Sequence, residues 1–460
     1  MKKFMRACVC ISMAITLATG CIGCGKKEVS KDSVETISVW TNAGATKAYM
    51  IKKIDEWNNT VGKEKGIKID YTVYGADYVT VYELAMENNQ APDILAISGD
   101  KRDYVLTNKI IPISDLPGGE EFIKESKSDI IDGVHRFDGK TYFVNVDANT
   151  VGLIYNVDLF KKAGIVDKEG NAKPPKTWDE VREDAKKISA LSNKVYGISF
   201  PFKWASYYNW VIANPFSASF ENIAKIDWDK QTYDMSNLKK PLQWLQNIKK
   251  DMTFFPGAEN MDNDTQRAQF AEGNIGMYVG ASWDVGVLTS QFVAKCDWDV
   301  AELPVLDIND RYLYSYSVGH SMCISKEAEK KDPEKIMEVF KFFYSPETMR
   351  ADYAEGRSIP ASSEFTKGVD LSDTPKQWKS FGKLTEHVRP SVPQPQLKLE
   401  GESASDLTYK VWTGTVTDLD AEIKKLNKTY TDALRKGIKD GSIKRETYDV
   451  MDKYDFKRKD

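Results

Sequence analysis

The chain contains 460 residues, of which 41% are hydrophobic and 29% are charged, so its composition is that of a folded globular protein rather than a disordered one. Its 64 basic and 68 acidic residues give a net charge of −4, which argues against a nucleic-acid partner, since such a partner calls for an excess of basic residues. The length suits two or three domains, or one large body with two lobes.

Residues 1–20 have the layout of a secretory signal peptide, with three basic residues followed by an apolar stretch over 7–18. The apolar stretch is shorter than the roughly 20 residues that cross a bilayer. Residues 17–21 read Leu-Ala-Thr-Gly-Cys, which resembles the lipobox of bacterial lipoproteins. That resemblance implies cleavage before Cys21, a diacylglycerol (palmitate) anchor on it, and a place on the outer side of the cell membrane. The alternatives are lipidation of Cys24, a poorer match, or an ordinary signal peptide with incidental cysteines.

The segment 21–35 is polar and has no apolar periodicity, so we predict a flexible tether. Loss of the signal peptide removes three of the 64 basic residues and leaves 61 against 68 acidic ones, a net charge of −7. Two cysteines remain in the folded body, Cys296 and Cys323, and they either form one disulfide or stay as isolated core thiols.

No metal site or cofactor is expected, because neither the cysteines nor the histidines show ligand spacing. The histidines are scattered along the chain at His135, His320 and His387.

Order begins with alternating strand and helix patterns. We predict strands over 36–40, 67–73 and 94–97, and helices over 47–57 and 78–87. This βαβαβ order implies a parallel sheet with right-handed crossovers. Ligands of such sheets bind beyond the carboxyl ends of the strands.

Several later stretches, taken in order, resemble family 1 of the extracellular solute-binding proteins, the bacterial sugar-binding proteins typified by the maltose-binding protein. These stretches are FDGKTY (137–142), GLIYNVDLF (152–160), AGI (163–165), PPKTWDE (174–180), FAEGNIGM (270–277), SW (282–283), LP (303–304), SVGH (317–320), and a helix over 336–344 followed by SPE (345–347).

The resemblance implies an α/β fold with two lobes, the periplasmic-binding-protein-like fold, in which each lobe is a mainly parallel sheet flanked by helices. We expect the chain to cross between lobes near Asp147, over 314–317 and after Pro360. The expected division assigns 36–146 and 315–360 to lobe 1, 147–314 and 361–445 to lobe 2, and 446–460 to a solvated C-terminal tail. A helix is predicted over 418–436, with Gly437 as its stop signal.

The function that the resemblance implies is that of the substrate-binding component of an ABC importer. Such a protein captures a carbohydrate, here expected to be an oligosaccharide, in the cleft between the lobes and closes on it by hinge bending. We expect a monomer that delivers its ligand to the transmembrane permease subunits and has no catalytic residues. The alternatives are a binding protein for a phosphorylated polyol or another non-sugar solute, and a secreted glycosidase.

Sugar capture needs aromatic rings that stack on pyranose C–H faces and polar groups that bind hydroxyls. The chain has 11 Trp, 22 Tyr and 19 Phe, most of which must belong to the core. The predicted ligand-binding residues are Trp283, Trp40, Asn42, Asp100, Asp147, Asn149 and Tyr207. Which ring of Trp204, Tyr207, Tyr208 and Trp210 faces the cleft is left open. Trp412 and Arg357 are weaker candidates, and the side chains predicted to be structural are Trp57, Trp178 and Trp244.

Overall fold

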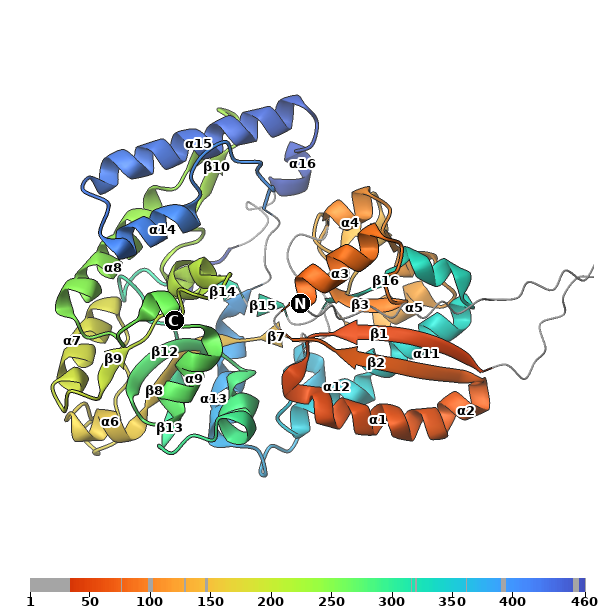
Figure 1. Cartoon of the computed structure of the whole chain (residues 1–460), viewed down its shortest axis with the longest axis horizontal. Helices are drawn as coiled ribbons and strands as arrows, with labels where there is room; N and C mark the ends of the chain where they lie inside the picture. The colour runs from red at the N-terminus through yellow and green to blue at the C-terminus, as the bar shows by residue number, and fades with distance from the viewer. Residues whose placement is uncertain are drawn as a thin grey trace, which may run out of the picture.

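The computed structural model describes residues 34–75, 77–97, 102–127, 130–144, 148–315, 317–318, 321–360, 362–389, 394–449 and 455–459. The predicted signal peptide, Cys21 and most of the predicted tether lie outside these residues. The chain folds into two α/β lobes that lie side by side (Figure 1), and the predicted two-lobed fold is confirmed. Within the described residues, no helix combines the length and apolar character that crossing a membrane requires.

The sheet of lobe 1 has five strands in the order β2-β1-β3-β16-β4. They are β1 (Glu35–Thr41), β2 (Ile67–Val73), β3 (Ile94–Ile97), β4 (Ile110–Ile111) and β16 (Ser321–Ser325). β1 pairs in parallel with β2 and β3, as the βαβαβ pattern predicts, while β16 runs antiparallel to β3 and β4. All residues of β3 and β16 are buried, because these strands lie in the interior of the sheet.

Helices and one short hairpin complete the described part of lobe 1. The helices are α1 (Lys47–Asn59), α2 (Val61–Lys65), α3 (Tyr78–Glu87), α4 (Arg102–Leu106), α5 (Gly119–Glu125), α11 (Pro333–Tyr344) and α12 (Pro346–Ala354), and the hairpin is β5 (Arg136–Phe137) with β6 (Lys140–Thr141). The predicted cap at 345–347 is present, because the Ser345 hydroxyl accepts a hydrogen bond from the Thr348 N–H at 3.1 Å and Pro346 opens α12.

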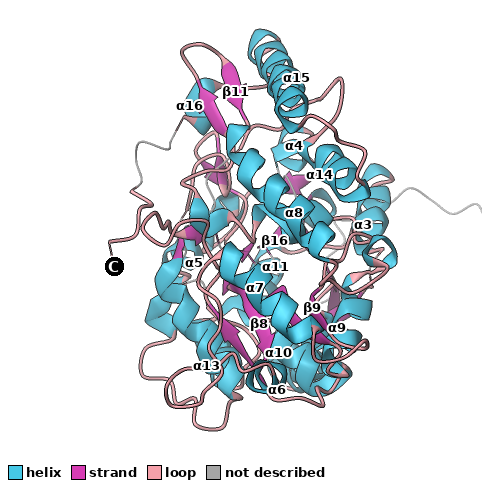
Figure 2. Cartoon of the chain, turned by 90° about the vertical axis from the view of Figure 1, so that its left-hand side faces the viewer, coloured by secondary structure: helices cyan, strands magenta, loops and turns pink. Residues whose placement is uncertain are grey.

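The sheet of lobe 2 has four strands in the order β13-β8-β12-β9. They are β8 (Val151–Asn156), β9 (Tyr196–Ile198), β12 (Ile275–Ala281) and β13 (Trp298–Ala301). The helices are α6 (Val157–Lys162), α7 (Trp178–Ser189), α8 (Lys239–Asp251), α9 (Asn263–Ala271), α10 (Asp284–Gly286), α13 (Lys376–Lys383), α14 (Ala404–Thr413), α15 (Leu419–Lys439) and α16 (Arg445–Tyr448), and β10 (Lys225–Asp227) forms a hairpin with β11 (Thr232–Asp234). Helices α7 and α8 cover the outer side of this lobe (Figure 2).

Helix α7 illustrates why the sequence is helical at this point. A capping box starts it, since the Thr177 hydroxyl accepts from the Glu180 N–H and the Glu180 carboxylate accepts from the Thr177 N–H. The buried positions Trp178, Val181 and Ala185 then recur with helical spacing. Trp178 and Trp244 are both buried in the core of lobe 2, so their predicted structural role is confirmed.

The sheets are mixed, and the prediction that they are mainly parallel is wrong in this detail. In lobe 2, β12 is parallel to β9, but β8 runs antiparallel to both β12 and β13. In lobe 1, the antiparallel strand β16 enters the sheet from a later part of the chain. Crossover helices connect parallel neighbours, but a strand that arrives from the other lobe is free to run in the opposite direction.

The two lobes are joined by short strands that pair with one another. β7 (Ala148–Asn149) lies antiparallel to β15 (Ser317–Val318), and the next pair, β14 (Tyr314–Ser315) and β17 (Val388–Arg389), is parallel. The Ala148 N–H also donates to the Ile359 carbonyl at 2.7 Å. Four parts of the chain therefore meet at the junction between the lobes, around residues 148–149, 314–318, 359 and 388–389.

Beyond α12 the chain does not change lobes at a single residue. Tyr353 and Ile359 pack with Trp378 in lobe 2, whereas Phe365 packs against the core of lobe 1. The residue limits of the two lobes therefore stay a prediction at this crossing.

The C-terminal region differs from its prediction in two ways. Helix α15 runs past Gly437, which lies against Ile443 so closely that a Cβ there would be 2.4 Å from the Ile443 side chain. Gly437 is thus a packing glycine rather than a stop signal. The last residues are docked rather than solvated, since Phe456 is buried, its carbonyl accepts from the Leu313 N–H at 2.7 Å, and its ring lies 3.9 Å from the Arg389 guanidinium.

Candidate ligand-binding site

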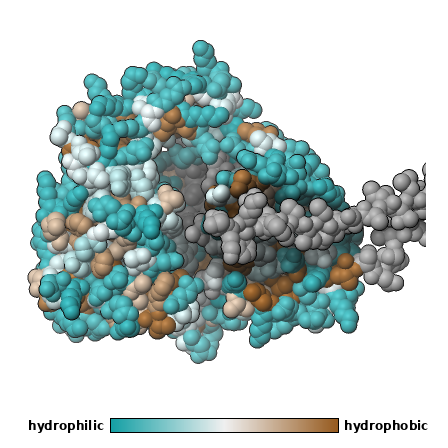
Figure 3. Space-filling model, viewed as in Figure 1, coloured by the Kyte–Doolittle hydropathy of each residue, from teal (hydrophilic) through white to brown (hydrophobic). Residues whose placement is uncertain are grey.

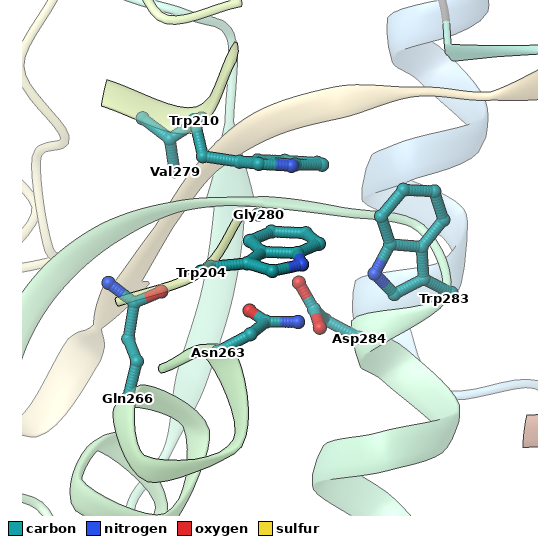
Figure 4. Close-up of a pocket in the computed structure, with 8 residues that line it drawn as sticks. All are labelled: Trp204, Trp210, Asn263, Gln266, Val279, Gly280, Trp283 and Asp284. Atoms are coloured by element: carbon teal, nitrogen blue, oxygen red, sulfur yellow. The ribbon is translucent and has the colours of Figure 1, made fainter. Parts of the chain in front are cut away.

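Three tryptophans form an aromatic wall on lobe 2. The rings of Trp204 and Trp210 are stacked, with centroids 5.3 Å apart and planes 17° apart. The Trp283 ring meets Trp210 edge to face at 5.6 Å and 70°. Figure 4 shows the Trp204 ring between Trp210 on one side and the Asn263 and Asp284 side chains on the other. Trp204 and Trp283 are only half-buried, so parts of both rings can meet a ligand.

Local backbone structure holds these rings in place. Strand β12 ends at Ala281, and Trp283 then caps the short helix α10. Trp210 lies in η3 (Asn209–Ala213), a π-helical turn in which the Asn214 N–H donates to the Asn209 carbonyl at 2.8 Å. Turns of this kind are rare and often occur at functional sites.

A polar network supports the wall from within lobe 2. The Asp284 carboxylate, 1% exposed, accepts from the Arg267 Nε at 2.6 Å and from the Ala281 N–H at 3.0 Å. Burial lowers the pKa of Arg267, but the charge and hydrogen bond of Asp284, together with Tyr278 and Asp264, outweigh burial, so the pKa of Arg267 is raised. The Asn263 amide oxygen accepts from the same guanidinium in the orientation that satisfies both groups. Arg267, Asp284 and Asn263 therefore form one connected unit beneath Trp204.

Lobe 1 presents a second aromatic surface at the carboxyl ends of β1 and β2. Trp40, the next-to-last residue of β1, lies edge to face with Tyr74 at 4.9 Å and 61°. The Tyr74 ring stacks on Tyr78 at 5.8 Å, and the Tyr78 hydroxyl donates to the Trp40 and Ala96 carbonyls at 2.9 and 2.8 Å. Burial raises the pKa of Tyr78, which stays a neutral donor. Asn42 follows the strand and is exposed.

The two surfaces belong to facing sides of the lobes. Strands β1 and β2 run toward lobe 2 and end near β7 (Figure 1), and the surface is hollowed between the lobes (Figure 3). On the other side of the junction, Ser282 precedes Trp283 and is tied to β7, since its hydroxyl bonds the Asn149 side-chain oxygen at 3.2 Å. The aromatic walls therefore flank the junction from which the cleft opens.

Arg357 adds a cation beside the lobe 1 wall. Its guanidinium lies 3.3 Å from the centroid of the Tyr49 ring, at the start of α1. It also pairs with Asp352 at 3.2 Å and with Glu355. The two carboxylates together outweigh its single positive charge, so Arg357 is not a free cation.

The structure brings together only some of the predicted site residues. Trp283 stands in the lobe 2 wall, and Trp40 and Asn42 lie at the facing edge of lobe 1. Asn149 is buried in β7 and bonds Ser282, so it supports the junction. Asp100 and Asp147 lie outside the described residues.

Two predicted candidates make their contacts with the core of lobe 2. Tyr207 packs against Phe202 and Tyr409, and its hydroxyl donates to the Ser405 carbonyl at 2.7 Å, which directs it toward α14. Trp412 is fully buried against Phe202. The prediction that Trp412 is a weaker candidate for ligand contact is therefore wrong, because this ring packs α14 against the core of lobe 2.

Sequence reasoning left the choice among the four rings of 204–210 open and missed the polar network. Trp204 lies in the turns before η3 and Trp210 lies within η3, so the stacking of the two rings is a tertiary contact that no regular helical spacing predicts. Asp284 and Arg267 are isolated charges in the sequence, and only the fold pairs them. In the sequence, the only indication that Asp284 lies at the site is its position directly after Trp283.

The two body cysteines lie apart and form no disulfide, with Cys323 in β16 of lobe 1 and Cys296 just before β13 of lobe 2. The prediction of isolated core thiols is therefore confirmed over the disulfide. Burial raises the pKa of the Cys296 thiol to about 11. Among the described residues, no group of three or more His, Cys, Asp or Glu side chains is arranged to hold a metal ion.

The family described as bacterial extracellular solute-binding protein matches residues 56–383. The chain belongs to this family.

Its relatives include the arabinooligosaccharide-binding protein of Bacillus subtilis, 26% identical over 56% of this chain and 57% of the relative. The maltotriose-binding protein of Pyrococcus abyssi is 25% identical over 55% of this chain and 51% of the relative. An sn-glycerol-3-phosphate-binding periplasmic protein of Brucella abortus is 26% identical over 48% and 50% of the two chains. The chain thus spans about half the length of the curated relatives it matches.

Solved structures agree on the fold. A chitin oligosaccharide binding protein superposes with a TM-score of 0.68 at 18% identity, covering 88% of this chain and 100% of the other. The maltose/maltodextrin-binding domain of Bdellovibrio bacteriovorus, bound to maltotriose, gives a TM-score of 0.66 at 16% identity over 88% and 100%. At this identity the likeness supports the two-lobed fold alone.

Proposed function

We propose that this protein is the substrate-binding component of an ABC importer and that it captures an oligosaccharide between its lobes without chemical conversion. The observation that carries the proposal is the pair of facing aromatic surfaces, Trp204, Trp210 and Trp283 on lobe 2 and Trp40 with Tyr74 on lobe 1. Two named relatives bind oligosaccharides, which supports the same ligand class.

The chemistry of the walls suits this ligand. Pyranose rings offer apolar C–H faces, and a large, rigid tryptophan surface buries such a face at little entropic cost. Exposed Asn42, directly after β1, offers a polar group beside the lobe 1 wall. A sugar clamped between two aromatic walls would lose water from its faces while its hydroxyls keep polar partners.

A phosphorylated polyol is the second candidate, favoured by the glycerol-phosphate-binding relative. A phosphate site needs cations that are free to pair with the ligand. Near the walls, Arg267 pairs with Asp284 and Asp264, and Arg357 pairs with Asp352 and Glu355. These guanidinium groups are already neutralised, and the described walls are aromatic, so the oligosaccharide is the better fit.

The lobes are proposed to close on the ligand about the junction of β7 and β15. A ligand that touches both walls binds the closed form better than the open one, and that difference in affinity is what shifts the population. The closed carrier then presents a different surface to the transmembrane permease subunits than the empty one. A monomer is sufficient for this action, since both walls come from one chain.

The test is a thermal-shift screen of the purified protein against a library of oligosaccharides, with sn-glycerol 3-phosphate and monosaccharides as further probes. At about a hundred times its Kd, a true ligand adds about 2.7 kcal/mol to the free energy of unfolding and raises Tm clearly. Stabilisation by an oligosaccharide supports the proposal. Stabilisation by sn-glycerol 3-phosphate alone would favour the second candidate, and turnover of a bound glycoside would show an enzyme.

We further propose that Cys21 carries the lipid anchor and holds the protein on the outer side of the cell membrane. Two acyl chains anchor far more firmly than one, and a diacylglycerol supplies two. Cys21→Ala should release the protein from the membrane fraction or leave the precursor uncleaved, with Cys24→Ala as the matched control. A correctly processed Cys21→Ala protein that still fractionates with membranes would refute this assignment.

A further inference from the structure

The lobes touch at a second place, well away from the strands that join them. Arg102, the first residue of α4 in lobe 1, donates a hydrogen bond to the hydroxyl of Tyr448 in α16, which belongs to lobe 2. The Arg102 guanidinium also lies 5.5 Å from the centroid of the Tyr448 ring. Figure 1 shows α4 and α16 near each other in the upper part of the view, while β7 and β15 lie lower, between the sheets of the two lobes.

Both partners of this contact are fixed to their own lobes. On lobe 2, the Tyr448 ring stacks on Trp228 at 6.4 Å with planes 10° apart, and Tyr448 belongs to the core cluster of that lobe. An ion pair of 2.7 Å between Arg445 and Asp229 ties α16 to the β10–β11 hairpin. On lobe 1, α4 packs through Tyr104, whose ring meets Tyr82 at 6.1 Å.

A contact with these properties depends on how far the lobes are open. Rotation about the junction moves the elements farthest from it by the largest amount, so opening separates α4 from α16 before it disturbs β7 and β15. Arginine over a tyrosine ring, with a hydrogen bond to the same side chain, is an attractive arrangement that is lost on separation.

We propose that Arg102 and Tyr448 form a bridge across the cleft that stabilises the closed arrangement and thereby sets ligand affinity, although neither residue touches the ligand. The inference rests on the proposed function, since it assumes that ligand binds the closed form. Two contributions then favour the free energy of closure, the ligand contacts and the bridge. When the bridge is lost, part of the binding free energy of the ligand is used to close the lobes, and the measured affinity falls.

The test is a double-mutant cycle across the lobes with Arg102→Gln and Tyr448→Leu. Leucine keeps an apolar side chain in the lobe 2 core, and Tyr448→Phe is a second variant that keeps the ring and removes only the hydroxyl. Each change should raise the Kd of the oligosaccharide found by the screen about three- to tenfold, mainly through faster dissociation. The double variant should bind no more weakly than the weaker single variant, because one contact is removed twice.

Controls on the same two helices are Asp103→Asn and Glu446→Gln, both at exposed positions, which should leave Kd unchanged. The radius of gyration of the unliganded protein gives a readout that needs no sugar. The bridge holds part of the unliganded wild-type population closed, so the radius should increase in Arg102→Gln and Tyr448→Leu relative to both controls. The bridge is refuted if the effects on Kd add fully, or if the singles change neither Kd nor the unliganded radius. Failure of the wild-type protein to bind any sugar would refute the proposed function. The radii of gyration of the unliganded variants would still test whether the bridge exists.

Discussion

At the scale of single residues, Trp283 is the side chain on which sequence and structure agree most closely. It is half-buried against Trp210, so its ring has both a support and an open part. We predict that Trp283→Ala weakens oligosaccharide binding about tenfold or more, because stacking and area burial are lost together. Isothermal titration calorimetry measures the effect, and Trp283→Phe should recover part of it.

The outcome for Trp283→Ala also separates two roles of the ring. An unchanged Kd would remove Trp283 from the site. A variant that is unfolded by circular dichroism would show that the ring serves the core of lobe 2 instead.

Asp284 and Arg267 provide a second residue-scale prediction, about stability. Asp284→Asn leaves the buried Arg267 guanidinium without its main counter-charge, and we expect it to cost about 3 kcal/mol of unfolding free energy. Asp264→Asn is the matched control, since Asp264 pairs with the same arginine at 3.1 Å but its side chain is 72% exposed, and it should cost under about 1 kcal/mol. Urea titration compares the two, and equal costs would contradict the account of the buried pair.

At the scale of elements, the sequence predicted the helices and strands that depend on local residue patterns. The helices at 47–57 and 78–87 and the strands at 67–73 and 94–97 are present with nearly these limits, because alternation and helical spacing are properties of the local chain. The direction of β8 and β16 in their sheets could not be predicted this way, because it depends on which distant strand each one joins.

The candidate site was predictable to a smaller extent. Trp283 follows β12 and Trp40 lies at the carboxyl end of β1, where ligand-binding residues of α/β folds are expected. The role of Tyr207 as a ligand contact stays a prediction, and the direction of its ring could not be predicted because its hydroxyl bonds the Ser405 carbonyl, which is distant in the sequence. The buried pair of Arg267 and Asp284 joins residues 17 positions apart on α9 and α10, a contact that only tertiary packing creates.

The C-terminal segment over 455–459 is docked on the body of the protein. Its charged composition suggested a solvated tail, but Phe456 anchors the segment through contacts with Leu313 and Arg389. Phe456→Ala should lower the free energy of unfolding by about 3 kcal/mol, the usual cost of emptying a buried aromatic position. Lys459→Ala, on the same segment at an exposed position, should stay within about 0.5 kcal/mol of the wild type. A negligible effect of Phe456→Ala in thermal unfolding would show that the segment is not anchored.

At the scale of the whole molecule, the sequence predicted two lobes and a family, and both are confirmed. The family motifs occur in order along the chain, so they identify the architecture even where single matches are weak. The residue limits of the lobes are harder to predict, because one helix can contribute to both cores. In α12, Met349 packs in the core of lobe 1 and Tyr353 packs in the core of lobe 2.

The central claim is that the lobes close around a sugar held between aromatic walls. Small-angle X-ray scattering of the wild-type protein, with and without saturating oligosaccharide, tests it most directly. The account predicts a clear fall in the radius of gyration on binding, because a ligand that touches both walls favours the closed form. An unchanged radius at saturation would mean a rigid site or a ligand held by one lobe, and would contradict closure.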